Sequence, residues 1–172
     1  MLEKKIINIA VHGVGTIGKR HLMAMNENQN VNLSGIIDIS DEAKQFCDNK
    51  NIPIYENLID LRKKSEINGV IISTPTIFHY ENTLAALELG LDVLIEKPIS
   101  ADVSEARTIA KVAEENNCKV LVGHQRRFYP LVRKAKEIVK NGEIGKIIGL
   151  SGVWALRKDN DYFDPNWRKK IS

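Results

Sequence analysis

The chain has 172 residues, of which 43% are hydrophobic and 27% charged, and its formal net charge is +3. This composition fits one folded domain with part of a second, and the 11 Gly and 5 Pro exclude a disordered or collagen-like chain. The longest apolar runs, such as residues 70–72 and 93–95, are far too short to span a bilayer, so we expect no membrane association.

The first residues of the chain and its clusters of basic residues bear on where the protein is located and what it binds. Residues 1–5 lead into a short apolar run and then glycines, without a secretory apolar region, so we expect a cytoplasmic protein. Basic residues gather only at 126–127, 133–136 and 168–170. A nucleic-acid-binding domain is usually far more basic, so we expect no nucleic-acid partner.

Two kinds of segment alternate along the first two thirds of the chain. Short β-branched runs predict buried parallel strands at residues 6–11, 31–37, 70–73, 92–95 and 119–122. Helical patterns between them cover residues 18–28, 41–48, 57–64, 80–89 and 102–117. Alternation of strands and helices with short connections predicts an α/β fold with a doubly wound parallel sheet.

The pattern changes after Val122. Residues 130–141 predict an amphipathic helix that ends at Gly142, and residues 146–156 predict a strand of a new kind, centred on 147–154. We therefore predict a first domain over residues 1–123 and, over 124–172, the start of a truncated second α/β domain that cannot close its own core. The new strand should expose an edge and an apolar face, which favours association.

A glycine turn follows the first predicted strand. Gly13, Gly15 and Gly18 form a G-x-G-x-x-G pattern between that strand and a helix, the context of a Rossmann dinucleotide-binding turn. Gly13 would permit the sharp turn, Gly15 the approach of a pyrophosphate, and Gly18 the packing of the helix on the strand. The N–H groups near Thr16 and Ile17 would hold the anion. The alternative is a glycine turn without a ligand.

A carboxylate stands where such a turn requires one. Asp38 lies twenty residues past Gly18, at the end of the second predicted strand and just before Ile39, in the position of a ribose-binding carboxylate. A 2′-phosphate there would meet like charge, worth about 1 kcal/mol in water and more near a protein surface. No arginine follows nearby, so we expect the cofactor to be NAD, with NADP disfavoured.

The predicted strand over residues 92–95 leads into Glu96, Lys97 and Pro98. Ligands of an open α/β sheet lie beyond the carboxyl ends of its strands, so these residues should reach the crevice. A hydride-transfer enzyme also needs a group that moves the alcohol proton, and a lysine can do so when its surroundings favour the neutral amine. Taken alone, such a triplet at a strand end is more often a loop with a surface salt bridge.

The remaining strand-end loops, residues 73–79 and 123–130, point to the same edge of the sheet. His79 and His124 fit either a ligand contact or a helix-start and packing role, and both alternatives stay open. His12 flanks the glycine turn and His21 lies on a predicted helix, so we interpret both as packing residues. No set of His, Cys and carboxylate residues has metal-ligand spacing, so we predict no metal site.

Together, the glycine turn with Asp38, the 73–79 loop, Glu96–Lys97–Pro98 and residues 123–128 resemble the Gfo/Idh/MocA oxidoreductases, relatives of glucose-fructose oxidoreductase and inositol 2-dehydrogenase. The resemblance implies that Lys97 is the catalytic lysine. With the motifs, it gives these candidate cofactor-binding residues: Gly13, Gly15, Thr16, Ile17, Gly18, Asp38, Ile39, Ser73, Thr74, Pro75, His79, Glu96, Lys97, Gln125, Trp167 and Arg168.

The resemblance also implies a reaction. We expect an NAD-dependent oxidoreductase that transfers a hydride between nicotinamide and a sugar, inositol or other cyclic alcohol, present here as its cofactor-binding half. We expect the full-length form to be a homo-oligomer and this chain alone to be inactive. The alternative is a non-catalytic NAD-binding sensor or regulatory module, which would need the glycine turn but not Lys97.

Overall fold

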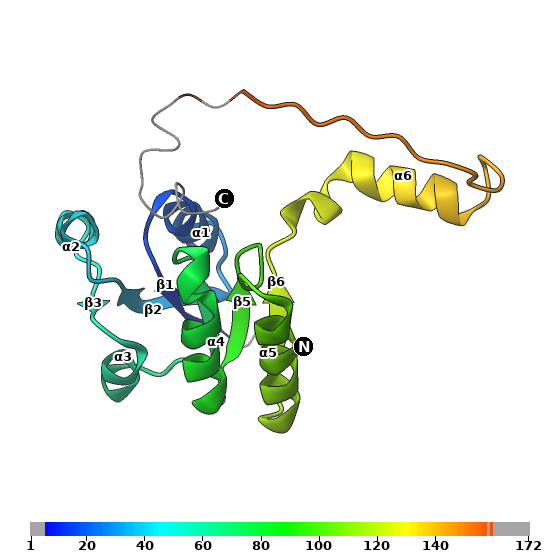
Figure 1. Ribbon diagram of the computed structural model, residues 1–172. Helices are drawn as coiled ribbons and strands as arrows, with labels where there is room; N and C mark the ends of the chain where they lie inside the picture. Colours follow the sequence, from blue (N-terminus) through cyan, green and yellow to red (C-terminus); the bar gives the residue numbers. More distant parts are fainter. Residues whose placement is uncertain (1–5, 158, 160–172) are drawn as a thin grey trace, which may run out of the picture. The chain divides into compact units, whose positions relative to one another are not determined.

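A computed structural model describes residues 6–157 and 159 of the chain. Strands and helices alternate along the chain (Figure 1). The elements are β1 (Ile7–His12), α1 (Thr16–Asn26), β2 (Val31–Ile37), α2 (Asp41–Asp48), β3 (Ile54–Tyr55), α3 (Leu58–Lys64), β4 (Gly69–Ile72), η1 (Thr76–Phe78), α4 (His79–Glu88), β5 (Asp92–Ile95), α5 (Val103–Glu115), β6 (Val120–Val122), η2 (Gln125–Phe128) and α6 (Pro130–Lys140).

The strands form one six-stranded sheet in the order β3-β2-β1-β4-β5-β6, and every neighbouring pair is parallel. β1 lies in the middle, with Val11 paired to Ile36 of β2 on one side and to Ile71 of β4 on the other. The chain crosses over between these two neighbours of β1. This confirms the doubly wound parallel sheet and puts its switch point, where such sheets bind ligands, at the carboxyl end of β1.

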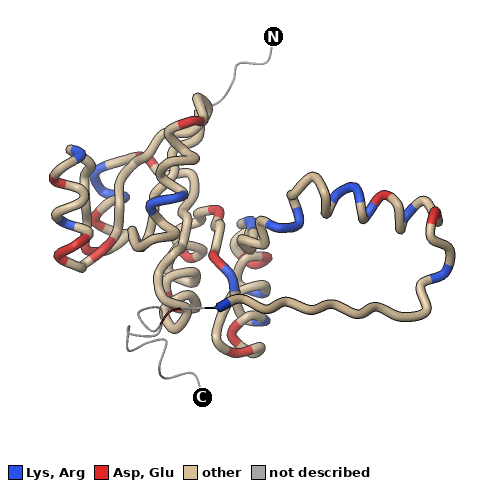
Figure 2. Tube along the Cα trace, turned by 90° about the horizontal axis from the view of Figure 1, so that it is seen from above, with Lys and Arg blue, Asp and Glu red and all other residues tan. Residues whose placement is uncertain are grey.

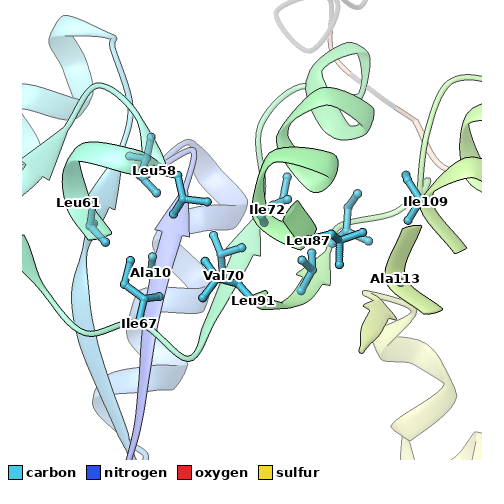
Figure 3. Close-up of a cluster of buried hydrophobic side chains, with 14 residues drawn as sticks. Ala10, Leu58, Leu61, Ile67, Val70, Ile72, Leu87, Leu91, Ile109 and Ala113 are labelled. Atoms are coloured by element: carbon cyan, nitrogen blue, oxygen red, sulfur yellow. The ribbon is translucent and has the colours of Figure 1, made fainter. Parts of the chain in front are cut away.

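Alternate residues of each strand point to opposite faces of the sheet, and helices pack on both faces. Ala10, Val70 and Ile72 belong to a buried cluster with residues of α3, α4 and α5 (Figure 3). Their neighbours Val11 and Ile71 belong to a second cluster with residues of α1 and α2. Two apolar cores therefore hold the strands rigidly, and the strand ends present the loops of the site.

The helices start differently from one another. Side chains of Ser40, Asn57 and Asp102 accept hydrogen bonds from the first-turn N–H groups of α2, α3 and α5, respectively. These caps satisfy amide groups that the helix itself cannot. α1 starts after Gly15 and has no side-chain cap. Its first turn, next to the glycine turn, thus has no competing side-chain acceptor.

Two parts of the sequence prediction need correction. The two-residue strand β3 was not predicted, because so short a segment shows no periodicity and is defined only by its pairing with β2. The strand predicted over residues 146–156 is wrong, since the structure gives residues 146–156 no strand. Its apolar side chains are exposed, with Ile148 at 97% and Leu150 at 92%. A strand needs a paired neighbour for its amide groups, and the described residues supply none.

The chain divides into two compact units, the first running to His124 and the second starting at Gln125. In the second unit, the predicted amphipathic helix is confirmed as α6, which begins with Pro130 and is followed by Gly142 at φ +73°. Figure 2 shows acidic and basic residues both spread along the trace, in keeping with the small net charge. Among the helices described, none has the length and apolar character needed to cross a membrane.

Candidate functional site

The glycine turn joins the carboxyl end of β1 to α1. Gly13 has φ +89°, and a Cβ there would lie 2.8 Å from the backbone nitrogen of Thr74. A Cβ on Gly18 would lie 2.1 Å from the carbonyl oxygen of Gly13, so only glycine lets α1 approach the turn this closely. Nothing lies within 4 Å of a Cβ built on Gly15. The backbone at Gly15 is therefore accessible from outside.

Asp38, directly after β2, is held beside this turn. Its Oδ2 accepts a hydrogen bond from the backbone N–H of Val14 at 2.8 Å, and its Oδ1 accepts from the N–H and hydroxyl of Ser40 at 2.9 and 2.8 Å. Burial favours the neutral carboxyl, but the hydrogen bonds from Val14 and Ser40 outweigh it and leave the pKa of Asp38 below its ordinary value. A fixed negative charge thus stands next to the glycine turn.

The groups around this charge are mostly neutral or acidic. Burial lowers the pKa of His12 to about 4, although the nearby Asp38 carboxylate favours the imidazolium, so His12 is uncharged at neutral pH. A hollow beside Asp38 is lined by three carboxylates and one lysine, together with two β3 side chains: Asp38, Asp48, Glu56, Lys44, Ile54 and Tyr55. Lys44 itself lies 3.5 Å from Asp41.

The loop after β4 packs directly on the glycine turn. The hydroxyl of Ser73 donates to the carbonyl oxygen of Gly13 at 2.7 Å. The backbone N–H of Ser73 donates to the backbone carbonyl oxygen of His12 at 2.8 Å. Asn82 of α4 donates to the Thr74 hydroxyl at 3.1 Å. Ser73, Thr74 and Pro75 therefore form the wall of the turn on the β4 side.

His79, for which the sequence left a cofactor contact or a packing role open, has a buried side chain. Its side chain is 1% exposed, with Nδ1 2.8 Å from the carbonyl oxygen of Pro98 and Nε2 2.9 Å from that of Thr74. Both ring nitrogens are thus occupied by backbone carbonyl groups inside the protein. His79 joins the loops after β4 and β5, and it has no exposed nitrogen with which to contact a ligand.

Glu96 and Lys97 follow β5 at the same end of the sheet. Lys97 is exposed, whereas one carboxylate oxygen of Glu96 lies 2.8 Å from Nε2 of His21 on α1. Sequence reasoning missed His21, which it interpreted as a packing residue. Its position one helical turn after Gly18 was the available signal, because that spacing puts it on the same face of α1 as the glycine that packs on the sheet.

The other predicted contact residues have varied surroundings. Thr16, Ile17 and Ile39 are exposed near the glycine turn and Asp38. Gln125 starts η2 at the beginning of the second unit, and its contact with a cofactor stays a prediction. Trp167 and Arg168 lie outside the described residues. Over residues 6–157 and 159, no group of three or more His, Cys, Asp or Glu could hold a metal ion.

The parallel sheet, the glycine turn at its switch point and the carboxylate held after β2 define a dinucleotide-binding protein of the Rossmann class. Residues 7–124 match the sequence model of the Gfo/Idh/MocA oxidoreductase family, described as having an NAD-binding Rossmann fold. The chain belongs to this family, as the sequence resemblance indicated.

Individual relatives cover most of the chain. The rhizopine catabolism protein MocA of Rhizobium meliloti is 29% identical over 81% of this chain and 44% of its own. A myo-inositol 2-dehydrogenase structure from Lactobacillus plantarum is 34% identical with TM-score 0.77, covering 84% of this chain and 44% of that one. A scyllo-inositol dehydrogenase from Lactobacillus casei, with bound NAD(H) and scyllo-inositol, is 29% identical with TM-score 0.75, covering 82% and 43%. The chain thus spans less than half the length of these relatives.

Proposed function

We propose that the chain is the cofactor-binding part of an NAD-dependent oxidoreductase that transfers a hydride between nicotinamide and a sugar, inositol or other cyclic alcohol. The observation that carries this proposal is the Asp38 carboxylate, anchored by the N–H of Val14 within the glycine turn. Family membership supports the oxidoreductase class, and the inositol dehydrogenases among its relatives support the substrate class.

The residues of the first unit fit a dinucleotide. The exposed backbone at Gly15 and the uncapped first turn of α1 suit the pyrophosphate, since helix N-termini attract anions. Asp38 is ionised and can accept hydrogen bonds from ribose hydroxyls. When bound, NAD would supply the hydride acceptor, and Gly15, the first turn of α1 and Asp38 would hold it.

Lys97 is the group that we propose moves the proton of the substrate alcohol. It is the second residue after β5 and is exposed, near the edge of the sheet where ligands of this fold bind. A neutral lysine amine could accept the proton of the alcohol oxygen while the carbon that bears this oxygen gives its hydride to nicotinamide, and the ammonium could return the proton in the reverse direction.

The acidic hollow beside Asp38 supports NAD over NADP. The 2′-phosphate of NADP would add negative charge next to Asp38, with Asp48 and Glu56 nearby. Lys44, the basic residue of the hollow, already lies near Asp41. Repulsion by one carboxylate near a protein surface is worth up to about 4 kcal/mol, which would separate the two affinities strongly.

Calorimetric titration of the chain with NAD and NADP tests the proposal. We expect NAD to bind at least about tenfold more tightly than NADP, and Asp38→Ala to remove most of this preference. Arg20→Ala, an exposed substitution on α1, serves as the matched control and should leave both affinities unchanged. Failure of the wild-type chain to bind NAD, or an unchanged preference in Asp38→Ala, would contradict the proposal.

The chain also allows a test of catalysis. Because it spans less than half of its relatives, we propose that it binds NAD without family-like turnover of polyols. Steady-state assays with inositols and sugars, following NADH absorbance, are expected to show no turnover above background. Turnover at a rate normal for a dehydrogenase would refute this part, and the same assay on Lys97→Ala would then test the role of Lys97.

A further inference from the structure

The contact between His21 and Glu96 joins two parts of the site that are 75 positions apart in the sequence. His21 lies on α1, one turn after the glycine that packs this helix on the sheet, and Glu96 follows β5. The distance between Nε2 and Oε1 is 2.8 Å, and the two side chains are 21% and 17% exposed. A partly buried pair of this kind is screened less by solvent than an exposed one.

The Glu96 carboxylate is confined from three sides. Besides the contact with His21, its Oε2 accepts a hydrogen bond from the backbone N–H of Lys97 at 3.3 Å. A Cβ built on Gly123, just after β6, would lie 3.1 Å from Oε1. A side chain at this position would therefore crowd the Glu96 carboxylate, and glycine leaves room for it. None of the ion pairs found among the described residues includes the Lys97 ammonium.

We propose that His21 is a positioning residue for Lys97: it binds the Glu96 carboxylate and thereby keeps this neighbouring negative charge from pairing with the Lys97 ammonium. The inference rests on the proposed function, in which Lys97 must give up and regain a proton. An unrestrained carboxylate on the preceding residue could turn to the ammonium and stabilise its charged form. At about 4 Å in water, such a pair makes the neutral amine about fivefold scarcer.

This role predicts a specific pattern of lysine reactivity. Acetic anhydride reacts only with neutral amines, so trace labelling at mildly alkaline pH, followed by peptide mass spectrometry, reports how available the Lys97 amine is. Lys111, exposed on α5, provides an internal standard in every sample. The experiment uses the whole chain without cofactor, so its result does not depend on whether the chain binds NAD.

We expect His21→Ala to lower the labelling rate of Lys97 about fivefold relative to Lys111. His21→Gln, whose amide can still donate to Glu96, should retain at least about half of the wild-type rate. Arg20→Ala, the exposed neighbour on α1, should leave it unchanged. In a Glu96→Gln background the carboxylate is absent, so adding His21→Ala should have no effect.

Two results would overturn the proposal. One is an equal Lys97 labelling rate in the wild type and His21→Ala. The other is an equal decrease in the Lys97 labelling rate when His21→Ala is introduced into the wild type and into the Glu96→Gln background. That result would mean that the substitution acts through a general change of the structure and not through the Glu96 carboxylate. Circular dichroism verifies that each variant folds, and His21→Leu, which fills the space without donating a hydrogen bond, replaces His21→Ala in the same comparison if the alanine variant unfolds.

Discussion

At the scale of single residues, Asp38 combines a structural and a ligand-binding role. Asp38→Asn removes the charge that strengthens the hydrogen bonds from Val14 and Ser40. We expect this substitution to lower the free energy of unfolding at neutral pH by about 1 kcal/mol, because hydrogen bonds to a charged acceptor are stronger than neutral ones. Urea unfolding followed by circular dichroism measures the difference.

The pH dependence of that difference has a definite sign. The pKa of Asp38 is lower in the folded chain than in the unfolded chain, where it has its ordinary value. The charge therefore contributes its full stabilisation when the pH is above that ordinary pKa. This contribution is lost as the pH falls through the folded pKa, and the gap between wild type and Asp38→Asn should close there. Asp41→Asn, which alters a 98% exposed carboxylate on the neighbouring helix, should show a much smaller gap. A gap that persists in acid would contradict the interpretation.

The sequence revealed some site residues more readily than others. Asp38 and Lys97 could be predicted because each directly follows or closely follows a recognisable buried strand, and strand ends of a parallel sheet form the site. For His21 the spacing from Gly18 indicated only its face of α1, and its contact with Glu96 could not be predicted, because the partner is distant in sequence and only the fold brings them together. For His79 the loop position left both a ligand contact and a packing role open, and only the fold shows that its ring nitrogens face backbone carbonyl groups.

At the scale of elements, the β1–turn–α1 segment has one glycine that we expect to matter for stability, Gly18, and another that we expect to matter for NAD binding, Gly15. Gly18→Ala puts a Cβ against the Gly13 carbonyl, so we expect it to destabilise the chain by about 3 kcal/mol. Gly15→Ala has open space and an extended backbone, so its stability should change by less than about 1 kcal/mol. Its methyl group would instead obstruct the pyrophosphate and weaken NAD binding about tenfold or more.

Thermal unfolding and NAD titration of both variants check this prediction. Gly149→Ala, in a segment where an added Cβ meets nothing within 4 Å, provides a control outside the turn. Equal destabilisation by Gly15→Ala and Gly18→Ala would show that the turn does not divide these roles.

Elements were predictable where local pattern and tertiary packing agree. The five longer strands of the sheet carry short apolar runs that marked them in the sequence, and all but the edge strand β6 contain buried residues. Residues 146–156 carry a similar pattern, with Ile147, Ile148 and Val153 among them, yet the structure gives them no strand. The difference is the neighbour: β-propensity becomes a strand only where another strand completes its hydrogen bonds, and sequence pattern does not report that.

At the scale of the whole molecule, the two units differ in their apolar residues: the buried ones lie in the first unit, whereas exposed ones occur in both. The buried hydrophobic residues found in the described part of the chain run from Ala10 to Ala113, all before the boundary at His124. In the second unit, Leu131, Ile148 and Trp154 are 85%, 97% and 72% exposed. The first unit therefore contains the packing that stabilises the fold, and the second contains apolar surface that favours association.

A fragment of residues 1–124 tests this division. Because it keeps both core clusters, we expect its free energy of unfolding to lie within about 1 kcal/mol of that of the whole chain. Because it lacks the exposed apolar residues of the second unit, it should remain monomeric at concentrations where the whole chain associates. Urea unfolding and sedimentation velocity measure the two properties. An unfolded fragment would mean that the second unit stabilises the first. Equal association of the fragment and the whole chain would instead assign the associating surface to the first unit, where Leu121 on the edge strand β6 is 66% exposed.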